Sequence, residues 1–229
     1  MQRVKVKICG LQEELHVRAA AEAGADYVGL VFAPSRRQVT AGQAVRLTSS
    51  LRDMPTRPVV VGVFVNETCQ QVNALVEQCG LDMVQLSGDE GSDYCARVTR
   101  PIIRTIRVFP GATQSSLERR IQEFLQGEPL EALSFLLDTG GEEVYGGTGR
   151  AFDWRMAREV VASHPVIVAG GLDPFSVNEL LGEMHPYGVD VSSGVERDGR
   201  KDSTLIRAFV RAVRKIEEES GHGISSNLS

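Results

Sequence analysis

The sequence predicts an α/β protein in which eight parallel strands, each followed by a helix, close into a single (β/α)₈ barrel of the TIM-barrel type. Short apolar runs rich in Val, Ile and Leu recur eight times, and stretches with helical periodicity separate them. The length of 229 residues also suits a barrel, since such folds commonly occupy about 200–250 residues as one domain.

The eight predicted strands are continuous apolar runs, as expected for parallel strands that are covered on both faces. They lie at residues 4–9, 27–32, 59–65, 83–86, 102–108, 133–137, 166–169 and 189–191. The chief alternative is an open, doubly wound sheet. Its GxGxxG fingerprint is absent after the first strand, where Cys9-Gly10-Leu11-Gln12 stands. The pattern therefore favours the closed barrel.

The clearest helices are predicted at residues 13–23, 68–79, 115–125 and 174–184, each with an apolar stripe. Gly24, Gly80 and Gly127 follow the first three and predict their ends. Asp173 is placed to cap the fourth. No linker-like stretch divides the chain, so we expect one catalytic domain over residues 1–220. The Gly- and Ser-rich tail at 221–229 is predicted to be disordered.

Composition and charge exclude several classes of function. The net charge of −5 gives no general attraction to nucleic acid or to anionic membranes. No apolar run approaches the roughly 18 residues that a membrane span needs. Four cysteines show no CxxC spacing and no signal-like leader precedes Val4, so we expect reduced thiols in the cytoplasm. The histidines fall away from strand ends, and no metal site is expected.

The first strand carries reactive groups on one face. Alternation along a strand places Lys5, Lys7 and Cys9 together. Taken alone, the cysteine could serve only as a small buried hydrophobe. Lys7, however, would be a charge inside the barrel and needs a partner. Asp190 lies on the eighth strand, which neighbours the first in a closed ring. We hypothesise a Lys7–Asp190 pair that stabilises the barrel mouth and biases Cys9 toward thiolate.

Other polar residues end the remaining strands, where barrel enzymes place their chemistry. Asp138 ends the sixth strand and could donate a proton if burial raises its pKa, although it could equally be a turn or capping residue. Cys9 could accept a proton if a nearby ammonium lowers its pKa. Arg36 and Arg37 follow the second strand, and an arginine there can hold a carboxylate with two hydrogen bonds. Gln85 is a further, supporting polar residue on the fourth strand.

The last three units end in glycine- and serine-rich loops, and these predict a phosphate site. Loops after the seventh and eighth strands often bind phosphate, because glycines let backbone N–H groups converge on the oxygens. Any one loop could be simple turn chemistry, but three in adjacent units favour an anion. The residues are Gly147, Thr148 and Gly149, then Gly170 and Gly171, then Ser192, Ser193 and Gly194.

These residues together resemble the phosphoribosylanthranilate isomerase family of tryptophan biosynthesis. The resemblance runs in order from about residue 4 to about residue 212. Its segments are Val6-Lys7-Ile8-Cys9-Gly10, Gly29-Leu30-Val31-Phe32, Ser35-Arg36-Arg37, Val61-Gly62-Val63-Phe64-Val65-Asn66, Val84-Gln85-Leu86-Ser87-Gly88-Asp89-Glu90, Leu137-Asp138, Gly147-Thr148-Gly149, Phe152-Asp153-Trp154, Ala169-Gly170-Gly171-Leu172, Gly188-Val189-Asp190-Val191-Ser192-Ser193-Gly194-Val195-Glu196, Gly199 and Lys201-Asp202.

The resemblance implies an Amadori rearrangement of N-(5-phosphoribosyl)anthranilate without metal or organic cofactor. It implies Asp138 as the general acid that opens the sugar ring, Cys9 as the general base at C2, and Arg37 at the substrate carboxylate. Two positions depart from the family pattern: Ser87 stands where histidine is common, and Arg36 where proline is common. The partner would be a small-molecule substrate, and the chain would be a monomer or a homodimer.

Two alternatives stay open at this point. One is the related sugar-phosphate isomerase of histidine biosynthesis, whose family has aspartate where this chain has Cys9. The other is a catalytically silent barrel that only binds a phosphorylated ligand. The presence of both Cys9 and Asp138 argues against it.

Overall fold

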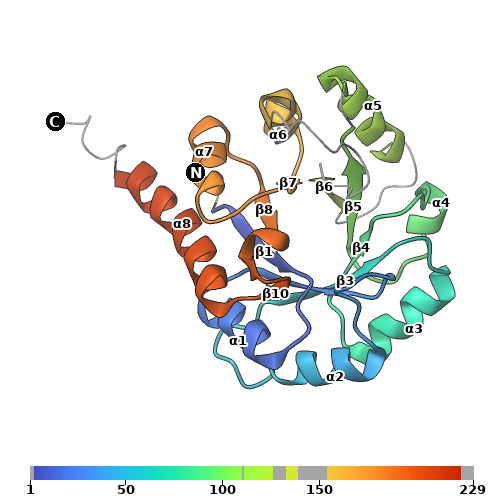
Figure 1. Cartoon of the computed structure of the whole chain (residues 1–229). Helices are drawn as coiled ribbons and strands as arrows, with labels where there is room; N and C mark the ends of the chain where they lie inside the picture. The colour runs from blue at the N-terminus through green and yellow to red at the C-terminus, as the bar shows by residue number, and fades with distance from the viewer. Residues whose placement is uncertain (1–2, 110, 126–132, 139–153, 223–229) are drawn as a thin grey trace.

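The computed structural model describes residues 3–109, 111–125, 133–138 and 154–222. Its main sheet is a closed barrel of parallel strands in sequence order (Figure 1). β8 pairs with β1, which completes the ring and confirms the predicted (β/α)₈ barrel. The barrel strands are β1 (Lys5–Cys9), β2 (Tyr27–Val31), β3 (Val59–Phe64), β4 (Met83–Leu86), β5 (Ile102–Arg107), β6 (Leu133–Asp138), β7 (Val166–Val168) and β8 (Gly188–Val191).

Helices surround the ring, because each strand is followed by a crossover that returns outside the sheet (Figure 1). They are α1 (Glu14–Glu22), α2 (Ala41–Ser49), α3 (Cys69–Cys79), α4 (Ser92–Cys95), α5 (Gln114–Leu125), η1 (Trp154–Ala157), α6 (Arg158–Ser163), α7 (Ser176–Glu183), η2 (Ser193–Val195) and α8 (Ser203–His222). A two-stranded antiparallel sheet of β9 (Glu196–Arg197) and β10 (Arg200–Lys201) follows β8. No helix in the described part of the chain is long and apolar enough to cross a bilayer.

The predicted helix ends agree with the structure where it describes them. Gly24 and Gly80 have φ of +87° and +64°, which is the left-handed conformation that ends a helix at little cost in glycine. The Asp173 side chain accepts hydrogen bonds from the backbone N–H groups of Phe175 and Ser176, both at 2.8 Å, at the start of α7. Gly127 lies outside the described residues.

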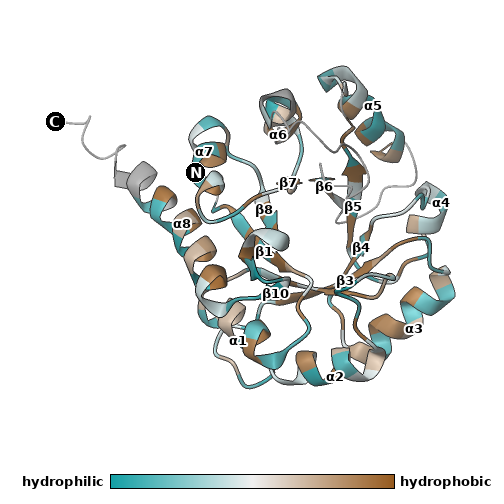
Figure 2. Ribbon diagram, in the orientation of Figure 1, coloured by the Kyte–Doolittle hydropathy of each residue, from teal (hydrophilic) through white to brown (hydrophobic). Residues whose placement is uncertain are grey.

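Successive residues of each strand alternate between the barrel interior and the helix-facing core. On β1 and just before it, Val4, Val6 and Ile8 pack in the large core under the helices. A smaller interior cluster consists of Tyr27, Val61, Ile103, Leu136, Ile167 and Ala169. Figure 2 shows brown, apolar strands at the centre and helices that carry both brown and teal residues. The same alternation brings the side chains of strand-end residues into the barrel mouth.

The end of the barrel opposite the mouth is held by a carboxylate. The Asp26 side chain accepts hydrogen bonds from Lys5 Nζ at 3.2 Å, from the Val6 N–H at 2.9 Å and from Arg214 Nη2 at 2.7 Å. Arg214 lies on α8 and also donates to the Val4 carbonyl. Asp26 therefore links the last helix to the first two strands.

α8 continues to His222 and so includes the first two residues of the 221–229 segment predicted as a disordered tail. Residues 223–229 lie outside the described residues.

Candidate active site

Lys7 and Asp190 form an ion pair inside the barrel. The two residues stand opposite each other in the β1–β8 register. Lys7 Nζ lies 2.9 Å from Asp190 Oδ1, and the Lys7 side chain is fully buried. Burial alone would lower the pKa of the ammonium, but Asp190 and Cys9 raise it above its usual value. The hypothesised pairing is therefore confirmed, and it places the Lys7 ammonium beside Cys9.

Cys9 is a buried free thiol at the carboxyl end of β1. Burial raises the pKa of Cys9, and Asp190 adds to this, whereas Lys7 and Lys201 lower it. Lys7 thus acts toward the thiolate, the direction hypothesised, while burial keeps the pKa of Cys9 above its usual value. Placing a thiolate in the barrel interior costs more free energy than its attraction to the two ammonium groups provides.

Glycine on β2 makes the room that Cys9 occupies. Gly29 stands opposite Cys9 in the β1–β2 register. A Cβ at Gly29 would lie 2.8 Å from Cys9 Sγ, closer than side-chain atoms normally approach. This position therefore requires glycine if the thiol is to keep its place.

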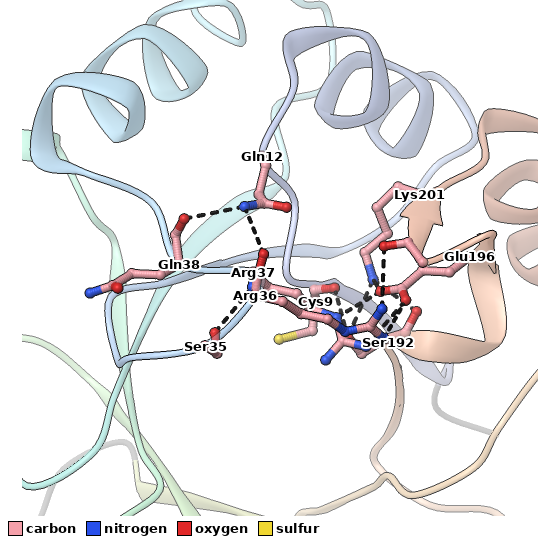
Figure 3. Close-up of polar contacts among 10 residues, drawn as sticks. Cys9, Gln12, Ser35, Arg36, Arg37, Gln38, Ser192, Glu196 and Lys201 are labelled. Carbon is pink, nitrogen blue, oxygen red and sulfur yellow. Dashed lines mark hydrogen bonds and ion pairs between the residues drawn. The ribbon is translucent and has the colours of Figure 1, made fainter. Parts of the chain in front are cut away.

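Arg37 is held against a carboxylate that the sequence analysis did not assign to the site. Arg37 Nε donates to Glu196 Oε1 at 2.6 Å, and Nη2 donates to Oε2 at 3.2 Å. The Arg36 side chain is half exposed and also donates to Glu196 Oε2, at 2.8 Å. Figure 3 shows these side chains converging on Glu196 near Cys9. Through these hydrogen bonds, the two arginines connect the loop after β2 with the segment after β8.

Lys201 completes this network from β10. Its Nζ donates to Glu196 Oε1 at 2.9 Å and to the Ser192 carbonyl at 2.8 Å. The Ser192 hydroxyl in turn donates to the Cys9 carbonyl at 3.2 Å. Burial alone would raise the pKa of Glu196, but hydrogen bonds and charge from Arg37 and Lys201 lower it to about 2. Glu196 is therefore ionised at neutral pH.

Gln85 belongs to a polar cluster inside the barrel. Its Nε2 donates to Ser87 Oγ at 3.1 Å and to Thr105 Oγ1 at 3.3 Å, and the two hydroxyls share a hydrogen bond of 2.8 Å. Gln85 Oε1 is buried and has no hydrogen-bond partner in the described part of the chain. Thr105 was not singled out from the sequence, although period-two alternation along its strand would have indicated it.

Asp138 ends β6 and is half buried. It stands opposite Arg107 in the β5–β6 register, and Arg107 donates to the Ser87 carbonyl at 3.1 Å. By the alternation that puts Leu136 in the interior cluster, the Asp138 side chain is on the interior-facing side of its strand. Arg107 is a second strand-end residue that the sequence analysis did not mention.

Two of the three predicted phosphate loops lie next to each other. Gly170 and Gly171 follow β7 with φ of +93° and +68°. A Cβ at Gly194 would collide with the Leu172 carbonyl oxygen, so the loop after β8 touches the loop after β7. Ser192 and Ser193 precede that contact. Gly147, Thr148 and Gly149 lie outside the described residues, as do Phe152 and Asp153 of the family pattern.

No group of three or more His, Cys, Asp or Glu side chains within the described ranges could hold a metal ion. The polar groups of the site are instead a thiol, carboxylates, cations and hydroxyls at the carboxyl ends of the strands. The fold and this lining define the general class of the protein, a (β/α)₈-barrel enzyme.

Comparison with known proteins identifies the family. Residues 6–212 match the family described as N-(5'-phosphoribosyl)anthranilate (PRA) isomerase. The chain is 41% identical over 214 residues to the N-(5'-phosphoribosyl)anthranilate isomerase of Dehalococcoides mccartyi, covering 93% of this chain and 97% of the relative. The chain belongs to the phosphoribosylanthranilate isomerase family.

Solved structures of this family share the fold. Monomers of the dimeric phosphoribosylanthranilate isomerase of Thermotoga maritima have a TM-score of 0.77 and 29% identity, over 93% of this chain and 99% of that one. Another phosphoribosyl anthranilate isomerase was solved with reduced 1-(o-carboxyphenylamino)-1-deoxyribulose 5-phosphate. It has a TM-score of 0.76 and 29% identity, with the same shares of the two chains covered.

Proposed function

We propose that the chain converts N-(5'-phosphoribosyl)anthranilate to 1-(2-carboxyphenylamino)-1-deoxyribulose 5-phosphate in tryptophan biosynthesis. One observation carries the proposal. The chain belongs to this family, and its Cys9 lies at the mouth of the barrel beside the buried Lys7–Asp190 pair. A relative bound to a reduced form of the product supports the substrate class.

Asp138 is the proposed general acid. It protonates the furanose ring oxygen, the bond from that oxygen to C1 breaks, and the nitrogen lone pair forms a Schiff base. Cys9, as the thiolate, then removes the proton from C2 to give an enolamine, which tautomerises to the ketone. Lys7 and Lys201 are the cations that lower the pKa of Cys9 and so stabilise the thiolate during this step. Each step moves a proton, and the residues proposed here supply the acid and the base.

Arg37 is the proposed partner of the substrate carboxylate. Its stem lies against Gly10, since a Cβ there would be 2.5 Å from Arg37 Cδ. Both arginines contact Glu196, but Arg36 also donates to the Gly199 carbonyl and has about half of its side chain exposed, whereas the Arg37 side chain is 21% exposed. These contacts support Arg37 over Arg36 for this role.

The proposed phosphate site is formed by Gly170 and Gly171 after β7 and by Ser192, Ser193 and Gly194 after β8. Their contiguity and the positive φ of the two glycines after β7 support it. Gly147, Thr148 and Gly149 are proposed to complete it.

A small phosphorylated substrate and free thiols at all four cysteines fit a cytoplasmic enzyme that is a monomer or a homodimer. The T. maritima relative described as dimeric, and solved as monomers, supports both oligomeric states.

The test is a fluorescence assay of phosphoribosylanthranilate consumption by wild type, Cys9→Ser and Asp138→Asn. Wild type should turn the substrate over, and each variant should lose at least about a hundredfold in kcat. An inactive wild type, or full rates in both variants, would contradict the proposal. Competitive inhibition by inorganic phosphate tests the phosphate site separately.

A further inference from the structure

Glu196 lies at the centre of a group of cations beside the proposed site. Its Oε1 accepts hydrogen bonds from Arg37 at 2.6 Å and Lys201 at 2.9 Å. Its Oε2 accepts from Arg36 at 2.8 Å and from Arg37 at 3.2 Å. The Glu196 side chain is only 6% exposed. An arginine held through Nε and one terminal nitrogen has the plane of its guanidinium fixed, so Glu196 determines the direction in which Arg37 points.

This contact joins two sides of the barrel mouth. Arg37 follows β2, Glu196 begins β9 after β8, and 159 residues separate them. From the other side, Gln12 Nε2 donates to the carbonyl groups of Arg36 and Gln38, both at 3.2 Å (Figure 3). The loop that carries Arg37 is thus held by the loop after β1 through its backbone and by Glu196 through its side chains.

The charges of the group favour an anionic ligand beside it. The Arg36, Arg37 and Lys201 side chains surround one carboxylate, so the group keeps a surplus of positive charge. Lys201 is itself almost fully buried and holds the Ser192 carbonyl. Glu196 can therefore order Arg37 without cancelling the positive charge that a substrate carboxylate needs.

We propose that Glu196 is the positioning residue for Arg37, which it holds in the orientation that meets the substrate carboxylate. The inference rests on the proposed function. It predicts that Glu196 contributes to substrate binding only through Arg37. A residue that merely stabilised the fold would act independently of Arg37.

A double-mutant cycle tests this directly. Glu196→Gln keeps the size of the side chain but places an amide NH₂ against guanidinium donors. We expect its KM for phosphoribosylanthranilate to rise about tenfold with kcat changed less than about threefold. Arg37→Gln should raise KM by about a hundredfold. The double variant should have the KM of Arg37→Gln alone. Multiplicative effects of the two changes on KM would overturn the inference.

Asp26→Asn is the matched control, since Asp26 is another carboxylate with several cationic partners, at the opposite end of the barrel. It should lower the free energy of unfolding and leave KM unchanged. An equal rise in KM in this control would mean that Glu196→Gln acts through general loss of structure, and would overturn the inference. An inactive wild type contradicts the proposed function itself, whereas an active wild type with an unchanged KM in Glu196→Gln contradicts only the positioning role.

Discussion

Cys9 is a thiol whose ionisation depends on three charged neighbours. Its pKa is raised by burial and by Asp190, and lowered by Lys7 and Lys201. Alkylation of Cys9 by iodoacetamide requires the thiolate, so its rate should rise as pH increases through the alkaline range. Lys7→Met should move this rise to higher pH, because it removes the cation that lowers the pKa of Cys9 most.

The pH profiles of wild type, Lys7→Met and a Cys69→Ser control measure this shift. Cys69 begins α3 in the outer ring of helices, and its Sγ lies 3.3 Å from the Arg97 carbonyl, so the profile of Cys69→Ser should match wild type. The same alkylation profile for Cys9 in Lys7→Met and in wild type would contradict the role given to Lys7.

Gly29 gives a second prediction at the scale of one residue. A Cβ at this position would press on Cys9 Sγ, so Gly29→Ala should displace the thiol and lower kcat/KM at least about tenfold. Gly42→Ala in α2 is the control, because its Cβ would meet only Arg46 Nη1 at 3.9 Å. It should keep full activity and raise the free energy of unfolding by up to about 1 kcal/mol. Full activity in Gly29→Ala would contradict the steric argument.

For individual residues, the sequence predicted the contact that follows from closure of the barrel. It did not predict the contact between the segments that fold over the mouth. Lys7 and Asp190 could be paired from sequence, because β1 and β8 must be neighbours in a closed ring. The contact of Arg37 with Glu196 depends on how two irregular segments fold over the mouth, and no periodicity encodes it. The sequence also indicated the direction in which Lys7 acts on Cys9 but not the opposing effect of burial, which depends on the depth of the site.

Among the secondary-structure elements, α8 is tied to the barrel by a charged contact. Arg214 on α8 donates to Asp26 at 2.7 Å and to the Val4 carbonyl at 2.8 Å. Arg214→Met should therefore lower the free energy of unfolding by about 2–4 kcal/mol. Urea unfolding measures this, with Arg207→Met as a control, since Arg207 on the same helix forms a half-exposed ion pair with Glu22. Equal losses in the two variants would contradict the role given to Asp26.

The same contact has a defined pH dependence. Hydrogen bonds from Val6, Arg214 and Lys5 outweigh burial and lower the pKa of Asp26. The ionised Asp26 therefore contributes its full share to the free energy of unfolding above the unfolded-state pKa of about 4. This contribution is lost as pH falls through the lower pKa that Asp26 has in the folded protein. Asp26→Asn should lose little further stability over that acid range. An unchanged acid sensitivity in this variant would contradict the prediction.

The elements themselves were predictable because continuous apolar runs separated by amphipathic stretches admit few arrangements. Gly24, Gly80 and Asp173 marked helix ends through local chemistry that needs no tertiary information. The short sheet of β9 and β10 carried no such signal, since each strand has two residues and the composition is charged. That sheet nevertheless supplies Glu196 and Lys201.

For the whole molecule, the proposed site exists only in the closed barrel, because its residues come from β1, β2, β6, β7 and β8. A ligand that binds only the folded state raises the free energy of unfolding, by about 2.7 kcal/mol at a hundred times its Kd. The reduced product analogue should therefore raise the urea midpoint of wild type, and much less that of Arg37→Gln. Equal shifts in both proteins would argue against a carboxylate contact at Arg37.

The partner of Lys7 lies 183 residues further along the chain. During synthesis the lysine and Cys9 emerge early, and the aspartate that balances the ammonium emerges only with the last strand. Until then, burying the unpaired Lys7 ammonium would cost more free energy than the packing of the incomplete barrel provides. A nascent chain that stops before β8 should thus stay open at this seam, and enzymatic activity should appear only when β8 and the segment through Lys201 are both free to fold.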